Sequence, residues 1–316
     1  MLLTRKSAYA EGTIVNFKTQ WTAYLLFCNY FEVNPFMVSV DFLCAYAQFL
    51  SRTFKSVQSI RNYLNGVRTL FLLHGQDNDF FSSFEIKLTL KGLERKLKHL
   101  PRQALPISLD ILEKIYQLID ITSPLDAVFW CLFLFAFFLM ARKSNLVPNS
   151  TRSVEKSKVL CRKDIKVYSD YLVVYFKWTK TIQLGNRILK IPLVAIPDSI
   201  FCPVRAYDRM CKLNPISIDS PAFSVCSKRS SVPITYNQLQ NKLKQLIREL
   251  GINPNLFSSH SFRRGGATLA SKSGVPPNLI QLMGDWKSDA YKQYVVHELS
   301  EKIKVAKHVR NFVLNH

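Results

Sequence analysis

The sequence has no Cys-x-x-Cys pair, no repeat and no low-complexity tract. Its seven cysteines are an odd number, and most lie in apolar surroundings. We therefore expect neither a disulfide framework nor a zinc site. A reducing compartment fits this cysteine pattern better. No N-terminal secretory pattern is present. The longest apolar run, residues 127–141, is shorter than the roughly 18–20 residues of a membrane span. We therefore interpret this run as a buried helix and expect no membrane partner.

Acidic residues are also scarce. The chain has 22 Asp and Glu against 43 Lys and Arg, a formal net charge of +21. The excess is spread along the chain, with 13 basic against 7 acidic residues in 1–105 and 30 against 15 in 106–316. A basic folded protein of this kind most often binds nucleic acid. On charge alone, a surface that serves solubility, a ribosomal role or a membrane-surface role stays open.

The first hundred residues have the apolar periodicity of helices, which we place at 13–31, 40–50, 57–74 and 84–100. In the first of these, apolar residues recur at spacings of three and four: Ile14, Phe17, Trp21, Leu25 and Cys28. The last is strongly basic, and its candidate DNA-binding residues are Lys87, Lys91, Arg95 and Lys98. This pattern predicts a mainly α N-terminal helical bundle, residues 1–100, with a basic last helix.

Residues 101–106 have a proline at each end and no periodicity, so they are the predicted linker to a second domain, 107–316. Ser108 is a plausible N-cap for the helix that follows. We expect further helices at 109–120, 124–141, 204–213, 236–251, 261–274, 277–284 and 298–314, and strands at 159–167, 171–178 and 187–192. Short hairpins set among helices predict an α+β domain.

The strongest chemical signal is His260-Ser-Phe-Arg263-Arg264-Gly-Gly, followed by Gly284-Asp-Trp286 and then Tyr291 and Tyr294. A His and an Arg three residues apart lie on one face of a helix. Cutting a DNA strand with a protein nucleophile requires an attacking group, donors that stabilise charge on the phosphoryl oxygens, and an acid for the leaving oxygen. Tyrosine can attack with help from cations, and a guanidinium binds two phosphate oxygens at once.

These two motifs, with Leu139-Met-Ala-Arg142-Lys-Ser-Asn-Leu before them, resemble the signature of the tyrosine recombinases, the phage-integrase family. In the family pattern Gly-Leu-Arg-x-x-Glu-Leu, the glycine position is Met140 and the glutamate position is Asn145. Trp286 stands where the family carries His or Trp. Tyr294 follows eight residues later, where the family usually has about nine. Tyr291 follows five residues later and stays the alternative nucleophile.

The resemblance implies a role for each of these side chains. Tyr294 would attack the scissile phosphate, while Arg142, His260, Arg263 and Trp286 hold its oxygens. Lys180, between two predicted strands, would protonate the leaving 5′ oxygen, with Lys177 as the competing choice. Arg264 would be a DNA-binding neighbour. The implied reaction uses no metal and no other cofactor.

The resemblance also implies an architecture and partners. Residues 1–100 would be a SAM-like core-binding domain, and 107–316 a catalytic domain of the DNA breaking-rejoining type with a C-terminal docking helix. The partners would be double-stranded DNA and three further copies, in a homo-tetramer on paired sites. The motif around Trp286 is most similar to recombinases of eukaryotic mobile elements, the DIRS-like retrotransposons and Cryptons. The location would be the nucleus in a eukaryote and the cytoplasm in a prokaryote.

Two other functions stay open at this point. A type IB topoisomerase shares the arginine, lysine, histidine and tyrosine chemistry, and would relax supercoils without a partner site. The second alternative is a non-catalytic DNA-binding protein derived from a recombinase, which the shortened spacing from Trp286 to Tyr294 keeps open.

Overall fold

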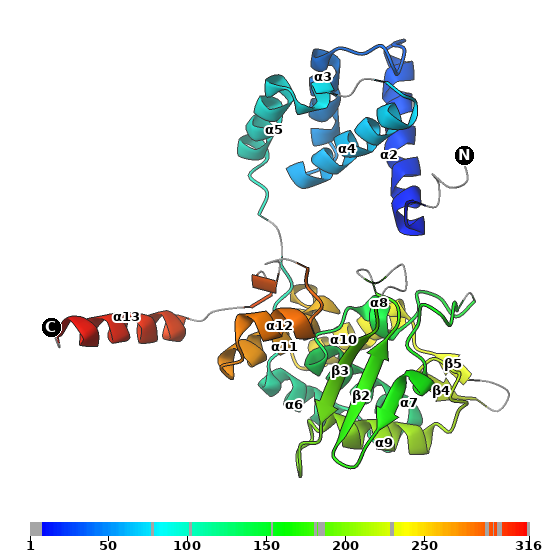
Figure 1. Ribbon diagram of the computed structural model, residues 1–316, viewed down its shortest axis with the longest axis vertical. Helices are drawn as coiled ribbons and strands as arrows, with labels where there is room; N and C mark the ends of the chain where they lie inside the picture. Colours follow the sequence, from blue (N-terminus) through cyan, green and yellow to red (C-terminus); the bar gives the residue numbers. More distant parts are fainter. Residues whose placement is uncertain are drawn as a thin grey trace. The chain divides into compact units, whose positions relative to one another are not determined.

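The chain divides into two compact units, Met1–Arg102 and Gln103–His316 (Figure 1). The computed structural model describes residues 8–76, 79–100, 103–152, 154–179, 182, 187–227, 231–287, 291–292, 294–295 and 299–314. Among these residues, no helix is both long enough and apolar enough to cross a membrane.

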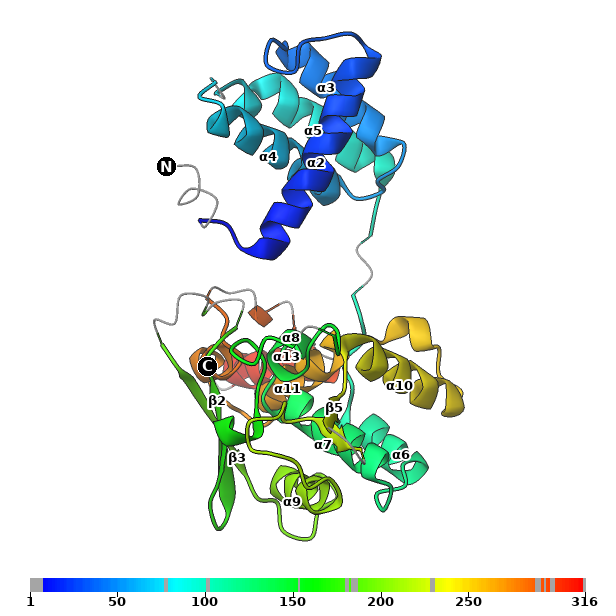
Figure 2. The same cartoon turned by 90° about the vertical axis from the view of Figure 1, so that its right-hand side faces the viewer.

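The first unit is a bundle of helices, as predicted (Figures 1 and 2). It consists of α2 (Glu11–Tyr30), α3 (Val40–Ser51), α4 (Val57–Leu73), the 3-10 turn η1 (Asp79–Ser82) and α5 (Phe84–Leu97). Its core is built from side chains of all four α-helices, among them Tyr24, Tyr46, Ile60, Phe71 and Leu90.

One detail of the predicted core face of α2 is wrong. Leu25 is 42% exposed, whereas Tyr24, Phe27 and Cys28 are buried. Successive residues of an α-helix are about 100° apart, so a spacing of three or four fits either Tyr24 or Leu25 after Trp21. Tyr24 takes the inner position because its hydroxyl finds an acceptor there, the Pro35 carbonyl at 2.8 Å.

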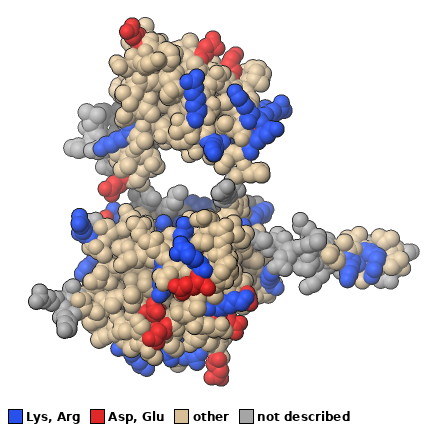
Figure 3. Space-filling view, turned by 180° about the vertical axis from the view of Figure 1, so that it is seen from behind, with Lys and Arg blue, Asp and Glu red and all other residues tan. Residues whose placement is uncertain are grey.

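The basic helix α5 is shorter than predicted. It ends at Leu97 because Lys98 adopts the left-handed conformation (φ 46°). Ile86, Leu90 and Leu93 form its buried side. The four candidate DNA-binding residues are all exposed: Lys87, Lys91, Arg95 and Lys98. Figure 3 shows the basic side chains gathered on this part of the first unit.

The second unit is an α+β domain, which confirms the predicted fold class. Its helices are α6 (Leu109–Leu118), α7 (Pro124–Phe138), α8 (Lys143–Leu146), α9 (Pro203–Leu213), α10 (Tyr236–Glu249), α11 (His260–Lys272), α12 (Pro277–Met283) and α13 (Leu299–Leu314), with 3-10 turns η2 (Arg162–Asp164) and η3 (Pro254–Leu256). Its strands are β1 (Ile165–Val167), β2 (Tyr171–Phe176), β3 (Leu189–Val194), β4 (Ser224–Cys226) and β5 (Ser231–Pro233).

Strands β1, β2 and β3 form an antiparallel sheet in sequence order. Alternate residues of β2 and β3 face the core, with Val174 opposite Ile191. The strand predicted at 159–167 is wrong over most of its length, since only Ile165–Val167 belongs to a strand. The preceding residues turn as η2, where the Asp164 carboxylate accepts a hydrogen bond from the Cys161 N–H at 3.0 Å. The pair β4–β5 was not predicted.

Helix α7 is the centre of the second unit. Residues 127–137 are all buried, as an apolar surface all round the helix requires. The helix ends at Phe138, three residues before the predicted end, because Met140 adopts a left-handed conformation (φ 47°). This turn delivers Arg142 to the start of α8.

Helix α11 packs directly on α7 because two glycines allow it. A Cβ at Gly266 would lie 2.0 Å from the Phe137 carbonyl oxygen, and one at Gly265 would lie 2.0 Å from that of Ile107. Between the two helices Phe262 stacks on Phe133, with ring centroids 4.9 Å apart. The close approach brings the first turn of α11 to the end of α7, where the candidate site lies.

Candidate active site

Arg263 is the centre of the candidate site. It projects from α11 and is 1% exposed. One terminal nitrogen donates to the Met140 carbonyl, and the other donates to the Gly284 carbonyl at 2.7 Å. Its Nε has no hydrogen-bond partner among the described residues. Burial, and then the positive charge of Arg142, lower the pKa of Arg263. The guanidinium is therefore a buried cation that forms no ion pair with a carboxylate of the described residues, an arrangement that favours a bound anion.

Trp286 covers this guanidinium. The Arg263 carbon Cζ lies 3.8 Å from the centroid of the Trp286 ring. The tryptophan is 7% exposed, and its indole N–H is buried without a partner in the described part of the chain. Gly284 makes this position possible, since a Cβ there would lie 1.7 Å from the ring carbon Cζ3 of Trp286. An indole N–H can donate to a phosphate oxygen.

Arg142 supplies a second guanidinium. It precedes α8 directly and is half-buried, and its Nη1 is buried with no hydrogen-bond partner among the residues described. The left-handed Met140, two residues earlier, also turns its carbonyl to Arg263. The family pattern has glycine at this position, where the left-handed conformation costs a glycine little. The departure at Met140 is thus accommodated at some cost in backbone strain.

His260 begins α11 and lies beside the same cations. The Ser258 hydroxyl accepts from the His260 N–H at 3.2 Å, whereas the Ser259 side chain makes no capping bond. Loss of water around the imidazole lowers its pKa, and Arg263, Lys143 and Arg142 lower it further. The ring is thus largely neutral at pH 7, when it can accept a proton or a hydrogen bond.

Of the two candidate tyrosines, Tyr294 has its ring beside the guanidinium. Its ring centroid is 5.3 Å from the Arg263 Cζ, 5.3 Å from the Trp286 ring and 6.5 Å from the His260 ring. It is partly exposed. Tyr291 is only 8% exposed and belongs to the apolar cluster with Trp286. This arrangement favours Tyr294 as the group that can reach a ligand.

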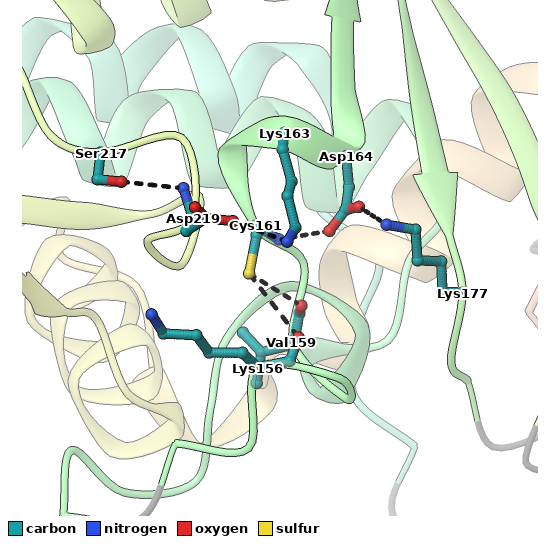
Figure 4. A network of polar contacts seen from close by, with 8 residues as sticks. All are labelled: Lys156, Val159, Cys161, Lys163, Asp164, Lys177, Ser217 and Asp219. Carbon is teal, nitrogen blue, oxygen red and sulfur yellow. Dashed lines mark hydrogen bonds and ion pairs between the residues drawn. The ribbon is translucent and has the colours of Figure 1, made fainter.

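The candidate lysine, Lys180, lies outside the described residues. The competing Lys177 is held elsewhere: it follows β2 and forms an ion pair with the buried carboxylate of Asp164 (Figure 4). Asp164 also accepts from the Cys161 N–H, so the pair belongs to the turn before β1. Lys177 is accordingly part of a structural ion pair.

Arg264, the other predicted DNA-binding residue of α11, is half-buried and donates to the Gln103 side chain at 2.9 Å. Burial lowers its pKa. It lies on a different face of the helix from Arg263.

The backbone N–H groups of Leu105 and Ile107 donate to the carbonyl oxygens of Leu256 and Ser261, so the end of the predicted linker is part of the second unit.

Residues 204–301, which include α11 and α12, match the model of the phage integrase family. No curated protein matches the sequence. Among solved structures, the Tn1549 transposon integrase in complex with transposon right end DNA aligns over 98% of this chain and 97% of its own, with 13% identity and a TM-score of 0.64. Over this length the chain has the same fold as that integrase. A lambda integrase dimer bound to a COC′ core site has a TM-score of 0.61, with 14% identity, over 92% of this chain and 91% of that one. The XerH recombinase bound to difH substrate has a TM-score of 0.54, with 16% identity, over 85% and 70%.

Within the second unit, the sequence analysis missed Asp285. Its side chain is only 5% exposed, it accepts from the Thr179 hydroxyl at 3.1 Å, and it forms an ion pair with Arg187. Asp285 lies nine residues before Tyr294, the spacing usual in the family for the phosphate-binding His or Trp. Its carboxylate nevertheless turns to Arg187, while the next residue, Trp286, covers Arg263. An acidic residue beside a tryptophan in a basic chain was the signal that could have revealed it.

Proposed function

We propose that the chain cuts and rejoins double-stranded DNA through a covalent bond between Tyr294 and the DNA. The observation that carries the proposal is a set of buried N–H groups without partners in the described part of the chain: Arg142 Nη1, Arg263 Nε and Trp286 Nε1. A buried donor without an acceptor costs about 1–3 kcal/mol. Three such donors around two cations can be satisfied together by one anion that has several acceptor oxygens, and a DNA phosphodiester is an anion of this kind.

The chemistry follows from this geometry. The Tyr294 hydroxyl oxygen attacks phosphorus and loses its proton, and the bond from phosphorus to the 5′ oxygen breaks. The 5′ oxygen takes up a proton and leaves as a hydroxyl, while the 3′ phosphate becomes an ester of tyrosine. The reverse reaction with a 5′ hydroxyl rejoins the strand. One phosphate ester replaces another at each step, so the reaction consumes no nucleoside triphosphate.

The neighbouring side chains divide the remaining work. Arg142, Arg263 and Trp286 stabilise the charge that builds on the phosphoryl oxygens. His260, neutral because its pKa is lowered, accepts the proton of Tyr294 or a hydrogen bond from it. Lys180 protonates the leaving 5′ oxygen.

The wider assignment rests on the comparisons and the charge. The Tn1549 integrase is in complex with transposon right end DNA, and lambda integrase is bound to a COC′ core site, which supports duplex DNA as the partner. The exposed lysines and arginine of α5 and Arg264 would contact its phosphates. We further propose a homo-tetramer on paired sites, docked through α13, and a role in a mobile element of the DIRS-like or Crypton kind. Unchanged assembly on DNA after deletion of residues 300–316 would contradict the docking role.

Covalent capture tests the proposal. Wild type, Tyr294→Phe and Tyr291→Phe would each be incubated with nicked duplexes, first from a random-sequence pool and then of the sequence that the wild type selects. A denaturing gel shows any protein–DNA adduct. We expect an adduct in wild type and Tyr291→Phe and none in Tyr294→Phe. DNA binding without an adduct in wild type would instead support the non-catalytic derivative.

The same protein separates the recombinase from the topoisomerase alternative. A type IB topoisomerase relaxes a supercoiled plasmid that lacks a selected site. We expect the wild type to leave such a plasmid supercoiled and to join two duplexes that both carry the selected site.

A further inference from the structure

The buried carboxylate of Asp285 joins two parts of the second unit that are distant in sequence. One carboxylate oxygen accepts from the Thr179 hydroxyl at 3.1 Å, and the other forms the ion pair with Arg187. Thr179 follows β2 and Arg187 precedes β3. Asp285 therefore contacts two residues that flank the β2–β3 connection, one on each side.

Thr179 is a fixed point at the base of this connection. It is fully buried, and its backbone N–H and carbonyl exchange hydrogen bonds with Ile182 at 3.2 and 3.1 Å. Its hydroxyl also accepts from the Ile182 N–H at 3.1 Å while donating to Asp285. The hydroxyl is thus used as both donor and acceptor, which fixes the turn to the carboxylate.

On its other side, Asp285 belongs to the segment that encloses Arg263. The preceding residue, Gly284, accepts from Arg263 through its carbonyl, and the following residue, Trp286, covers the guanidinium. Asp285 itself has a left-handed backbone (φ 53°), which costs a non-glycine residue free energy. Its contacts to Thr179 and Arg187 hold that conformation. A carboxylate facing the phosphate would repel it, so Asp285 acts through its neighbours.

We propose that Asp285 is a positioning residue: it holds Thr179 and Arg187 against the segment that encloses Arg263, and so supports protonation of the leaving 5′ oxygen by Lys180. This inference rests on the function proposed above. It links Asp285 to one step of the reaction, the protonation of the leaving group. A residue that is important only for stability would not affect this step selectively.

The test compares two leaving groups on the same DNA. One nicked duplex, of the sequence that the wild type selects, has the natural oxygen at the scissile 5′ position, and a second has sulfur there. A thiol has a pKa of about 8.5, so the thiolate leaves without a proton. General acid catalysis contributes roughly 10²–10⁴-fold to a rate. A defect in protonation alone therefore disappears on the sulfur substrate.

We expect Asp285→Asn to form the adduct about 100-fold more slowly on the oxygen substrate and within about threefold of wild type on the sulfur substrate. Lys180→Ala should show the same pattern. The matched control is Asp219→Asn, which removes a carboxylate from the exposed ion pair with Lys163 in the same unit. This variant should react like wild type on both substrates.

Equal slowing of Asp285→Asn on both substrates, or no slowing on either, would overturn the inference and leave the proposed function intact. A wild type that forms no adduct would overturn the proposed function itself. Should Asp285→Asn fail to fold, Thr179→Val removes the hydroxyl, and with it the bond to Asp285 and the bond from the Ile182 N–H, and leaves the ion pair of Asp285 with Arg187. It should show the same selective defect to a smaller degree, and its absence would equally contradict the inference.

Discussion

Replacing Gly266 by alanine should destabilise the second unit more than almost any other substitution that adds a single methyl group. The added Cβ would lie 2.0 Å from the Phe137 carbonyl oxygen and 3.1 Å from the carbonyl carbon. Ordinary contact begins at 3.4 Å, so α11 and α7 would have to separate by more than an ångström. The obstacle is backbone and cannot rotate away. Overpacking costs typically 1–3 kcal/mol, and we expect about 3 kcal/mol here.

The assay is urea unfolding of the full chain, with Gly92→Ala as the matched control. Gly92 lies inside α5 with nothing within 4 Å of an added Cβ, so the same substitution there should stabilise by about 0.8–1 kcal/mol, the difference in helix propensity. Tryptophan fluorescence follows the unfolding, with Trp21 in the first unit and Trp130, Trp178 and Trp286 in the second. A Gly266→Ala variant within about 0.5 kcal/mol of wild type, the range of neutral substitutions, would refute the close packing of α11 on α7.

Three further predictions concern the site. The pKa of His260, measured by NMR in the free protein, should lie below the ordinary 6.5 and should rise when sulfate binds. Protonation of His260 therefore destabilises the free protein as the pH falls below about 6.5. An unshifted pKa would contradict the influence of burial and of the neighbouring cations on this ring. Sulfate at 100 times its dissociation constant should stabilise wild type by about 2.7 kcal/mol over sodium chloride of equal ionic strength, and Arg263→Ala should lose this gain. Gly284→Ala should displace the Trp286 ring and slow cleavage by about 30-fold. This factor corresponds to the loss of a desolvated cation–π contact of about 2 kcal/mol. Cleavage at the wild-type rate would contradict the role of the ring.

Periodicity predicted most of the helices because their buried faces repeat along the chain. It failed where one residue ends an element through its backbone, as left-handed Lys98 and Met140 do at the ends of α5 and α7. It also failed for β4 and β5, which have three residues each and are too short to show alternation. The choice between Tyr24 and Leu25 depended on an acceptor, the Pro35 carbonyl, that only the folded chain brings near.

The site followed from the sequence to the extent that it consists of motifs. Arg263, His260, Trp286 and Tyr294 come together because α11 begins at His260 and the Trp286 segment packs on it. The roles of Asp285 and Gly284 could not be predicted. The role of Asp285 depends on contacts with Thr179 and Arg187, which are far away in sequence. The role of Gly284 depends on the space that its missing side chain leaves for the Trp286 ring.

The most direct test of the account is to identify the amino acid that carries the DNA. The wild-type adduct would be digested with nuclease and protease, and the modified peptide would be sequenced by mass spectrometry. The account predicts a nucleotide joined through its 3′ phosphate to Tyr294. A nucleotide on Tyr291 or on any other residue, or cut DNA with no modified peptide, would contradict it.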